Sequence, residues 1–392
     1  MAGDPIKRVE LSDGTVRYRF VVDIGRDPKT GKRRQITKTF DTKREAKAEH
    51  ARIKHQTGEG SYVAPSKLTV GDWLDTWLKS ATVDLEKATA RSYQDALRCV
   101  YDLLGDRKLQ TLTEEDIDDL IRWMLTSGRK IGGKPGTGLG LRSVQLMLNR
   151  LRAALNEAVR RRLVVRNVAE AARIPKAARE AAAEAKAERT PWSTEEVKAF
   201  LATIREDRLY APMLLSLMGL RPAEACGLRW TPDVDLEAQT VKAGDNTRTL
   251  VVGEVVEKGA KSEAGKRGLP LPVQAVSALK AFRARQAAEK LAAGEAYEDS
   301  GYVVVDELGR AVKTDWLRRR FYKLIERAGV RKVRLYDARH ACLTYLATSG
   351  VPDVIVSAWA GHADLSFTKR VYIHPNADHL KVAADQLGEL LG

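Results

Sequence analysis

Several features that mark common protein classes are scarce or absent in this chain of 392 residues. Its three cysteines, Cys99, Cys226 and Cys342, are far apart and match neither a zinc spacing nor a disulfide framework, so we expect a reducing cytoplasm. No run reaches the ~18 apolar residues of a membrane span, and MAGDPIKRVEL lacks the apolar core of a secretory signal. The six histidines form no ligand cluster with cysteine or carboxylates, and we expect neither metal nor cofactor.

Acidic residues are the minority among the charges. Lysine plus arginine number 67 against 52 aspartates plus glutamates, a formal net charge of +15. This excess favours a polyanionic partner, most commonly nucleic acid, although a basic protein without such a partner is the alternative. The length allows two or three domains, and 44% apolar residues suffice for packed cores.

Residues 1–64 predict a small β-sheet-plus-helix module. Apolar residues alternate with polar ones over 16–24, which indicates a half-buried strand. A turn at 28–31 and a second strand follow, and Thr42 with Glu45 resembles a capping box that opens a helix. A basic sheet face can enter a DNA groove, or it can simply be solvated. The basic residues expected on the free face are Arg17, Arg19, Lys32, Arg33, Arg34 and Lys38.

Residues 65–174 predict a four-helix domain. Thr69 and Thr113 each precede an amphipathic helix, and Trp73 and Trp77 share the apolar face of the first, which favours a core role. Residues 127–140 read as a mobile glycine-rich loop; it resembles a P-loop but lacks the hydroxyl that would bind Mg²⁺. Basic residues off the apolar stripe of the fourth helix would contact phosphates. These include Arg142, Arg150 and Arg160.

Residues 175–190 contain no large apolar side chain except the proline ring and predict an exposed, partly helical linker. Residues 191–392 predict a mainly helical domain with a small antiparallel sheet, whose strand-like segments are 238–243, 249–256 and 267–271. The expected fold class is therefore mostly α and multidomain.

The segment 334–374 carries the chemistry. Arg339 can fork two N–H bonds onto a phosphate, and His362 can donate a hydrogen bond or a proton near neutral pH. Tyr372 offers an oxygen nucleophile that can hold a covalent intermediate. Tyr336 and Tyr345 are equally competent nucleophiles by chemistry alone.

These blocks resemble the tyrosine recombinases, or phage-type integrases. The segment GLRPAEACGLRW matches the family's upstream arginine block and supplies Arg221 and Glu224. The segment KSEAGKRGLPLP resembles its lysine hairpin and points to Lys261, with Lys258 and Lys266 as close competitors. The family's next block usually opens with histidine, where this chain has Tyr336.

The resemblance implies a role for each site residue. Arg221 and Arg339 would neutralise the phosphate, and Tyr372 would attack it to leave a 3′-phosphotyrosyl bond. Lys261 would protonate the leaving 5′-oxygen, while His362 and Tyr336 would hydrogen-bond the phosphate. The residues expected to orient the arginines are Glu224 and His340.

The resemblance also implies an integrase of a phage or mobile element, with an arm-binding N-terminal module and a core-binding helical domain. Such enzymes act as homo-tetramers on double-stranded DNA, with an excisionase or a DNA-bending host factor as further partners. The amphipathic tail at 380–391 would dock on a neighbouring protomer or on its own domain. The rival interpretations are a type IB topoisomerase-like relaxing enzyme and a DNA-binding regulator that has lost catalysis.

Overall fold

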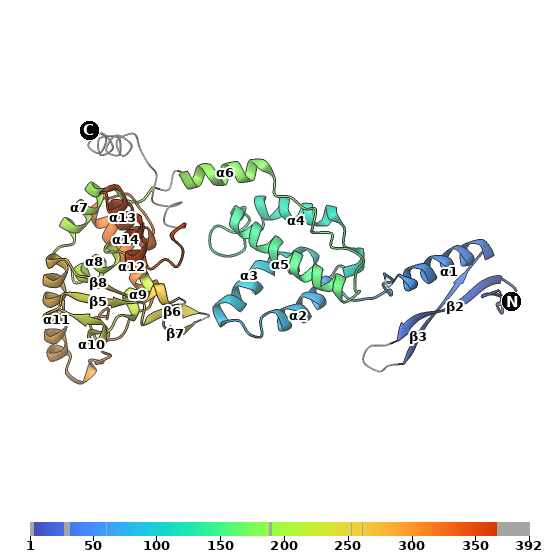
Figure 1. Ribbon diagram of the computed structural model, residues 1–392, viewed down its shortest axis with the longest axis horizontal. Coiled ribbons are helices and arrows are strands. Elements are labelled where there is room, and N and C mark those ends of the chain that lie inside the picture. The colour runs from blue at the N-terminus through green and yellow to red at the C-terminus, as the bar shows by residue number, and fades with distance from the viewer. Residues whose placement is uncertain are drawn as a thin grey trace, which may run out of the picture. The chain divides into compact units, whose positions relative to one another are not determined.

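Helices dominate the computed structural model of the chain (Figure 1), which describes residues 4–26, 32–59, 61–187, 190–251, 253–260 and 262–366. The described strands form small antiparallel sheets. The expected fold class is therefore confirmed: mostly helical, with a sheet-plus-helix module at the N-terminal end. In the described part of the chain, no helix combines the length and apolar character needed to cross a bilayer.

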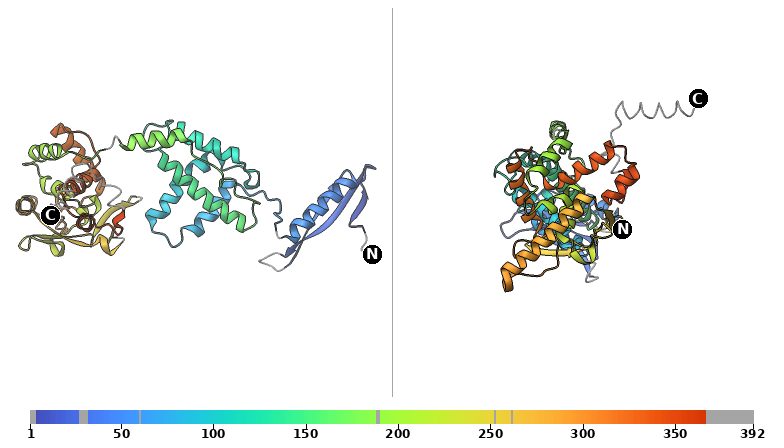
Figure 2. Two further views of the ribbon diagram at one scale, coloured as in Figure 1. Left: turned by 45° about the horizontal axis from the view of Figure 1, so that its top comes forward. Right: turned by 90° about the vertical axis from the view of Figure 1, so that its left-hand side faces the viewer.

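The N-terminal module packs one helix on one sheet. Strands β1 (Ile6–Glu10), β2 (Val16–Arg26) and β3 (Arg33–Phe40) pair antiparallel, and α1 (Lys43–Gly58) lies along one face (Figures 1 and 2). Alternation along β2 buries Phe20 and Val22 with Ile53 of α1. The Thr42 side chain accepts from the backbone N–H of Glu45, which caps α1.

One prediction about this sheet is wrong. Lys38 pairs in register with the buried Phe20, so it lies on the helix-covered face, where its Nζ is 2.6 Å from Glu49 Oε1 of α1. Arg34 has the same strand parity as Lys38. The opposite face carries Arg17, Arg19 and Arg33, and Lys32 precedes the strand. Not all six basic residues therefore share the free face, because side chains alternate with period two.

Four helices form the next core: α2 (Val70–Ala81), α3 (Lys87–Leu104), α4 (Glu114–Thr126) and α5 (Leu141–Arg160), with a 3₁₀ turn, η1 (Leu109–Thr111), between α3 and α4. Capping boxes begin α2 at Thr69 and α4 at Thr113, as predicted. Trp73 and Trp77 are 2% and 6% exposed, and the Trp73 indole donates to the carbonyl of Ala154. Their predicted core role is confirmed.

A single arginine organises the loop between α4 and α5. The Arg129 guanidinium donates to the carbonyls of Gly132 and Gly138 and to the Thr137 hydroxyl, which ties both sides of the loop together. A Cβ at Gly138 would lie 1.9 Å from the carbonyl oxygen of Leu125, so only glycine fits there. The loop therefore has a defined internal structure, whereas its predicted mobility stays a prediction.

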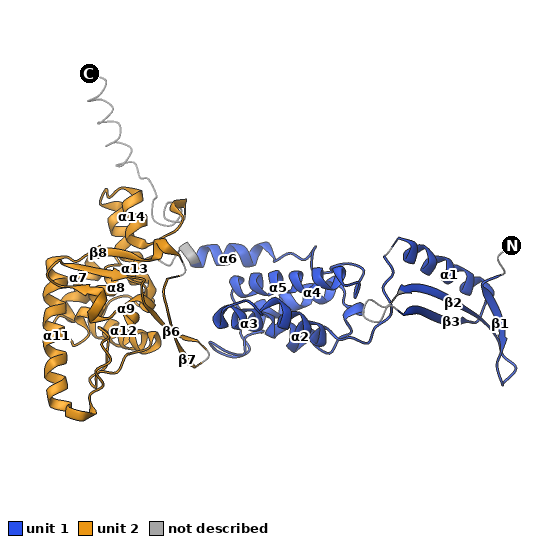
Figure 3. Ribbon diagram, turned by 60° about the horizontal axis from the view of Figure 1, so that its bottom comes forward, with its two compact units in different colours: residues 1–187 blue, residues 188–392 orange. Residues whose placement is uncertain are grey.

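The chain divides into two compact units, residues 1–187 and 188–392 (Figure 3). Helix α6 (Lys176–Ala187) ends the first unit, so the division falls within the segment predicted as a linker.

The second unit places two small sheets among helices. Its first half contains α7 (Thr194–Thr203), α8 (Tyr210–Leu217), α9 (Pro222–Gly227), α10 (Trp230–Asp233), β4 (Val234–Asp235) and β5 (Thr240–Ala243). Next come β6 (Thr247–Val251), β7 (Glu254–Lys258), η2 (Glu263–Gly265) and β8 (Arg267–Pro270). The remaining elements are α11 (Val273–Ala293), η3 (Gly294–Ala296), α12 (Thr314–Ala328), α13 (Leu335–Thr348) and α14 (Asp353–Ala360).

Strand β5 pairs with β4 and β8, while β6 and β7 form a separate hairpin. The predicted single strand over 249–256 is wrong, because the chain reverses there at Gly253, whose φ is +83°. Around these sheets one large core contains the packed rings of Trp192, Phe200 and Phe321, whose centroids lie 4.9 to 5.7 Å apart. This core supports the ends of α8, α13 and α14, where the candidate site lies.

Candidate active site

Arg221 stands at the start of α9, where a local hydrogen-bond pair holds it. Its backbone N–H donates to Glu224 Oε2 at 2.8 Å, and its Nη1 donates to Glu224 Oε1 at 2.5 Å. Pro222 occupies the first helical position, which suits a residue without an N–H. Glu224 is 1% exposed, whereas the Arg221 side chain keeps 30% exposure. The carboxylate is therefore a buried anchor for a partly open guanidinium.

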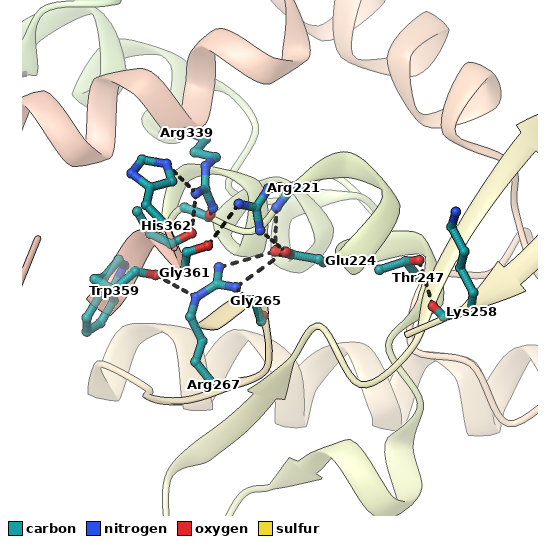
Figure 4. Close-up of polar contacts among 12 residues, drawn as sticks. Arg221, Glu224, Thr247, Lys258, Gly265, Arg267, Arg339, Trp359, Gly361 and His362 are labelled. Carbon is teal, nitrogen blue, oxygen red and sulfur yellow. Dashed lines mark hydrogen bonds and ion pairs between the residues drawn. The ribbon is translucent and has the colours of Figure 1, made fainter. Parts of the chain in front are cut away.

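A second arginine, Arg267 of β8, reaches the same carboxylate from the other side (Figure 4). Its two terminal nitrogens contact the two Glu224 oxygens at 3.2 and 3.3 Å, in a forked geometry. Sequence reasoning missed this residue. A signal was present, because Arg267 has the strand parity of the buried Leu269 and therefore had to face inward.

Arg339 of α13 is completely buried at 0% exposure. Its Nη1 donates to the carbonyl of Gly219 and its Nη2 to that of Ala360, while Nη2 also lies 3.3 Å from His362 Nε2. Because arginine only donates, Nε2 must accept, which places the proton of a neutral His362 ring on Nδ1. The Arg339 Nε is also buried and has no hydrogen-bond partner in the described part of the chain.

The C-terminal end of α14 meets three guanidinium groups. The carbonyls of Trp359, Ala360 and Gly361 accept from Arg267, Arg339 and Arg221 respectively, at 2.6 Å for the first and 3.2 Å for the last. Gly361 ends the helix in the left-handed conformation, with φ +63°. These contacts place His362, the next residue, beside the arginines.

The electrostatic balance of the cluster is positive. Burial opposes ionisation of Glu224, but Arg267 and then Arg221 outweigh it and hold the pKa of this carboxyl below its usual range. Burial, followed by the charges of Arg339 and Arg221, lowers the pKa of His362 to about 4, so the imidazole is neutral at pH 7. Among the described residues, three guanidinium groups thus face one carboxylate and a neutral imidazole. This surplus suits a phosphodiester anion.

Tyr336 and His340 lie together on α13. Tyr336 is 39% exposed, and its ring meets that of His340 edge to face at 5.1 Å between centroids. Burial is the main cause that lowers the pKa of His340, although Asp337 acts in the opposite direction. The phenol is thus accessible to a ligand, one turn of α13 before Arg339.

Two of the three lysine candidates for the general acid lie in the described part of the chain. Lys258 ends β7 and lies on the far side of Glu224 from His362 (Figure 4), and Lys266 is 2.9 Å from Glu263. Lys261, Tyr372 and the tail at 380–391 lie outside the described residues.

The three arginines of α5 that were predicted to contact phosphates differ in their exposure and in their partners. Arg142 is exposed near the start of the helix. The Arg150 guanidinium carbon lies 3.7 Å from the centroid of the Tyr93 ring, and Arg160 is paired with Glu157. Arg150 is therefore already engaged by a partner of its own core.

Three segments of the sequence match known families. Residues 192–379 match the phage integrase family, residues 69–125 match the phage integrase N-terminal SAM-like domain, and residues 6–57 match an arm DNA-binding domain. The first match covers every residue of the arginine cluster.

Relatives match along nearly the whole chain. A tyrosine recombinase XerC-like protein of Caldanaerobacter subterraneus is 28% identical over 400 residues, covering 97% of this chain and 98% of its own. An integrase of Streptomyces ambofaciens is 26% identical, covering 91% and 89%.

Solved structures share the fold. The Tn1549 transposon integrase in complex with a circular intermediate DNA has a TM-score of 0.64 at 17% identity, covering 82% of this chain and 99% of its own. A lambda integrase tetramer bound to a Holliday junction has a TM-score of 0.56 at 17% identity, covering 95% and 97%.

Proposed function

Because the chain belongs to the phage integrase family of tyrosine recombinases and is therefore a site-specific DNA recombinase, we propose that the arginine cluster is its strand-cleavage site. The observation that carries this proposal is the convergence of Arg221 and Arg339 on the end of α14 beside a neutral His362. Two guanidinium groups would neutralise the non-bridging oxygens as the phosphorus becomes five-coordinate. His362 would donate its Nδ1 proton to the same phosphate.

The chemical step exchanges one ester for another. The Tyr372 oxygen attacks the phosphorus in line, the bond to the 5′-oxygen breaks, and a 3′-phosphotyrosyl bond forms. The tyrosine proton passes to a nearby group or to the phosphate, and Lys261 gives a proton to the leaving 5′-oxygen. A general acid of this kind contributes about 10²–10⁴ in rate. Rejoining reverses the step and requires no ATP, because the covalent bond keeps the phosphodiester energy.

Covalent trapping tests the nucleophile. On a nicked duplex that releases a short strand after cleavage, the wild-type protein should accumulate a protein–DNA adduct, measured by denaturing gel. Tyr372→Phe should form none, because no oxygen remains to attack. Tyr336→Phe should still form measurable adduct, because its phenol only hydrogen-bonds. Equal and complete loss in both variants would contradict this assignment.

The general acid is tested by three matched variants, Lys258→Ala, Lys261→Ala and Lys266→Ala. A DNA substrate with a 5′-phosphorothiolate leaving group needs no protonation, since a thiolate leaves readily. The variant whose slow cleavage this substrate restores has lost the acid, and we expect it to be Lys261→Ala. Restoration in Lys258→Ala or Lys266→Ala instead would move the role to that lysine.

The biological setting follows from the partners of the relatives. The Tn1549 and lambda integrases were solved on DNA, the latter as a tetramer on a Holliday junction. We propose that this chain likewise assembles as a homo-tetramer on crossover sites in the bacterial cytoplasm. The N-terminal module would bind separate arm sites, and an excisionase or DNA-bending protein would set direction. Recombination of two sites, rather than relaxation of supercoils alone, is the expected activity of the purified protein.

A further inference from the structure

We propose that Arg267 is a positioning residue for strand cleavage: it holds Glu224 charged and braces the end of α14, so that Arg221 and His362 face one phosphate. This inference rests on the proposed function of the arginine cluster. Arg267 is unlike a surface arginine, because its side chain is only 8% exposed.

The contacts of Arg267 connect three parts of the site. Its Nε donates to the carbonyl of Trp359 at 2.6 Å, and its Nη1 donates to the carbonyl of Gly265 at 3.0 Å. Its two terminal nitrogens also donate to the Glu224 carboxylate. The Glu224 carboxylate in turn accepts hydrogen bonds from the backbone N–H and the side chain of Arg221. A displacement of Arg267 would therefore reach Arg221 through the carboxylate and His362 through the helix end.

The C-terminal end of α14 and the three guanidinium groups stabilise one another. The last carbonyls of a helix have no partner within the helix and carry the negative end of its dipole. Successive carbonyls at 359, 360 and 361 each receive a different guanidinium. This arrangement offsets the repulsion among three buried or half-buried cations before any phosphate arrives.

Close packing between Arg267 and α14 also explains why a glycine, Gly361, precedes His362. A Cβ at Gly361 would lie 2.9 Å from Arg267 Nη1 and 2.8 Å from the carbonyl oxygen of Ala264. Any side chain at this position would push Arg267 away from Glu224. Glycine is thus required by the arginine as well as by its positive φ.

The pH dependence of cleavage separates this role from a merely structural one. The charged groups that act on Glu224 are Arg267 of β8 and Arg221 at the start of α9, with Arg339 of α13 beyond them. Removal of Arg267 takes away the largest opposing charge while burial remains, so the pKa of Glu224 must rise. Below that pKa the carboxyl is neutral and no longer attracts the Arg221 guanidinium electrostatically, so cleavage slows as the pH falls.

The experiment measures single-turnover cleavage of the nicked duplex across pH by the full-length protein. Arg267→Gln should cleave roughly 10–100-fold more slowly at neutral pH, with unchanged duplex affinity. The acid side of its pH–rate profile should move to higher pH. Arg267→Lys keeps the positive charge but not the two parallel hydrogen bonds to Glu224. It should therefore restore the acid side of the wild-type pH–rate profile, but only part of the cleavage rate.

Arg331→Gln is the matched control. Arg331 also pairs with a glutamate, Glu196, and donates to two backbone carbonyls, but it lies outside the arginine cluster. Its substitution should leave the acid limb unchanged.

The proposal would be overturned if Arg267→Gln cleaved at the wild-type rate. It would also be overturned if the cleavage rate fell by the same factor at every pH, so that the acid side of the pH–rate profile did not move. If the glutamine variant does not fold, full wild-type rate in Arg267→Lys would overturn it. Failure of the proposed function is a distinct result, since Arg221→Ala and Tyr372→Phe would then both still cleave.

Discussion

His362 shows how the environment of one residue decides its chemistry. An imidazole in water has a pKa of 6.5, but burial and the flanking arginines lower that of His362 to about 4. The ring therefore accepts from Arg339 and keeps one proton for a ligand. An exposed histidine without these cations would instead titrate near the ordinary pKa of about 6.5.

This shift predicts an acid-dependent stability. Between pH 6.5 and about 4 the unfolded chain binds a proton at His362 that the folded chain does not. The contribution of the neutral His362 ring to the free energy of unfolding is complete above pH 6.5 and is lost as the pH falls toward 4. His362→Gln should therefore lose less thermal stability than the wild-type protein on acidification through this window. Thermal unfolding followed by circular dichroism checks this, and parallel losses in the two proteins would contradict it.

At the scale of elements, strand parity separates the basic residues of the N-terminal sheet. Arg19 lies on the face opposite α1, with its Nε 3.3 Å from the Thr39 hydroxyl, whereas Lys38 lies under α1 beside Glu49. Arg52 and then Lys38 hold the pKa of Glu49 at about 2, against the effect of burial. Only one of these two cations is therefore positioned to meet a DNA groove.

A matched pair of variants tests this face. Arg19→Ala should weaken binding of the full chain to arm-site DNA and reduce the salt dependence of log K by about 0.9, because one phosphate contact is lost. Lys38→Ala should leave affinity and salt slope unchanged. Both are measured by fluorescence anisotropy over a salt series. Equal weakening by the two variants would show that DNA contacts the helix-covered face or its edge.

At the scale of the molecule, each of the two compact units has packed cores of its own. Every described residue of the arginine cluster belongs to the unit 188–392. The unit 1–187 carries the basic sheet face and the four-helix domain. The proposed chemistry and most of the predicted DNA contacts thus fall in different units of the chain.

Division of the chain should separate these tasks. Fragment 188–392 should melt cooperatively around its large core, whereas fragment 1–187 should show two transitions, because the N-terminal module and the four-helix domain have separate cores. Fragment 188–392 should still form the covalent adduct, although only at higher DNA concentration, and fragment 1–187 should bind DNA without any adduct. Calorimetry and the gel assay measure these outcomes. An adduct on fragment 1–187 would place the nucleophile in the wrong unit.

Local signals in the sequence determined much of this protein. Capping pairs such as Thr69 with Asp72, and the apolar stripes behind them, depend on neighbours within a few residues, so the helices were predictable. The resemblance to the recombinase blocks pointed to Arg221, Arg339 and His362, which the fold brings together.

Tertiary structure decided what depends on distant partners. The bonds of Arg267 to Glu224 and of Arg221 to Gly361 join residues 43 and 140 positions apart. The face taken by Lys38 depends on which residue of β2 it pairs with and on the position of α1. Helix caps and alternation act over one or two turns of chain, whereas a buried ion pair forms only where packing excludes water and leaves no other partner. Strand parity could therefore place Arg267 on the inward face, but only the folded molecule showed that its partner is Glu224.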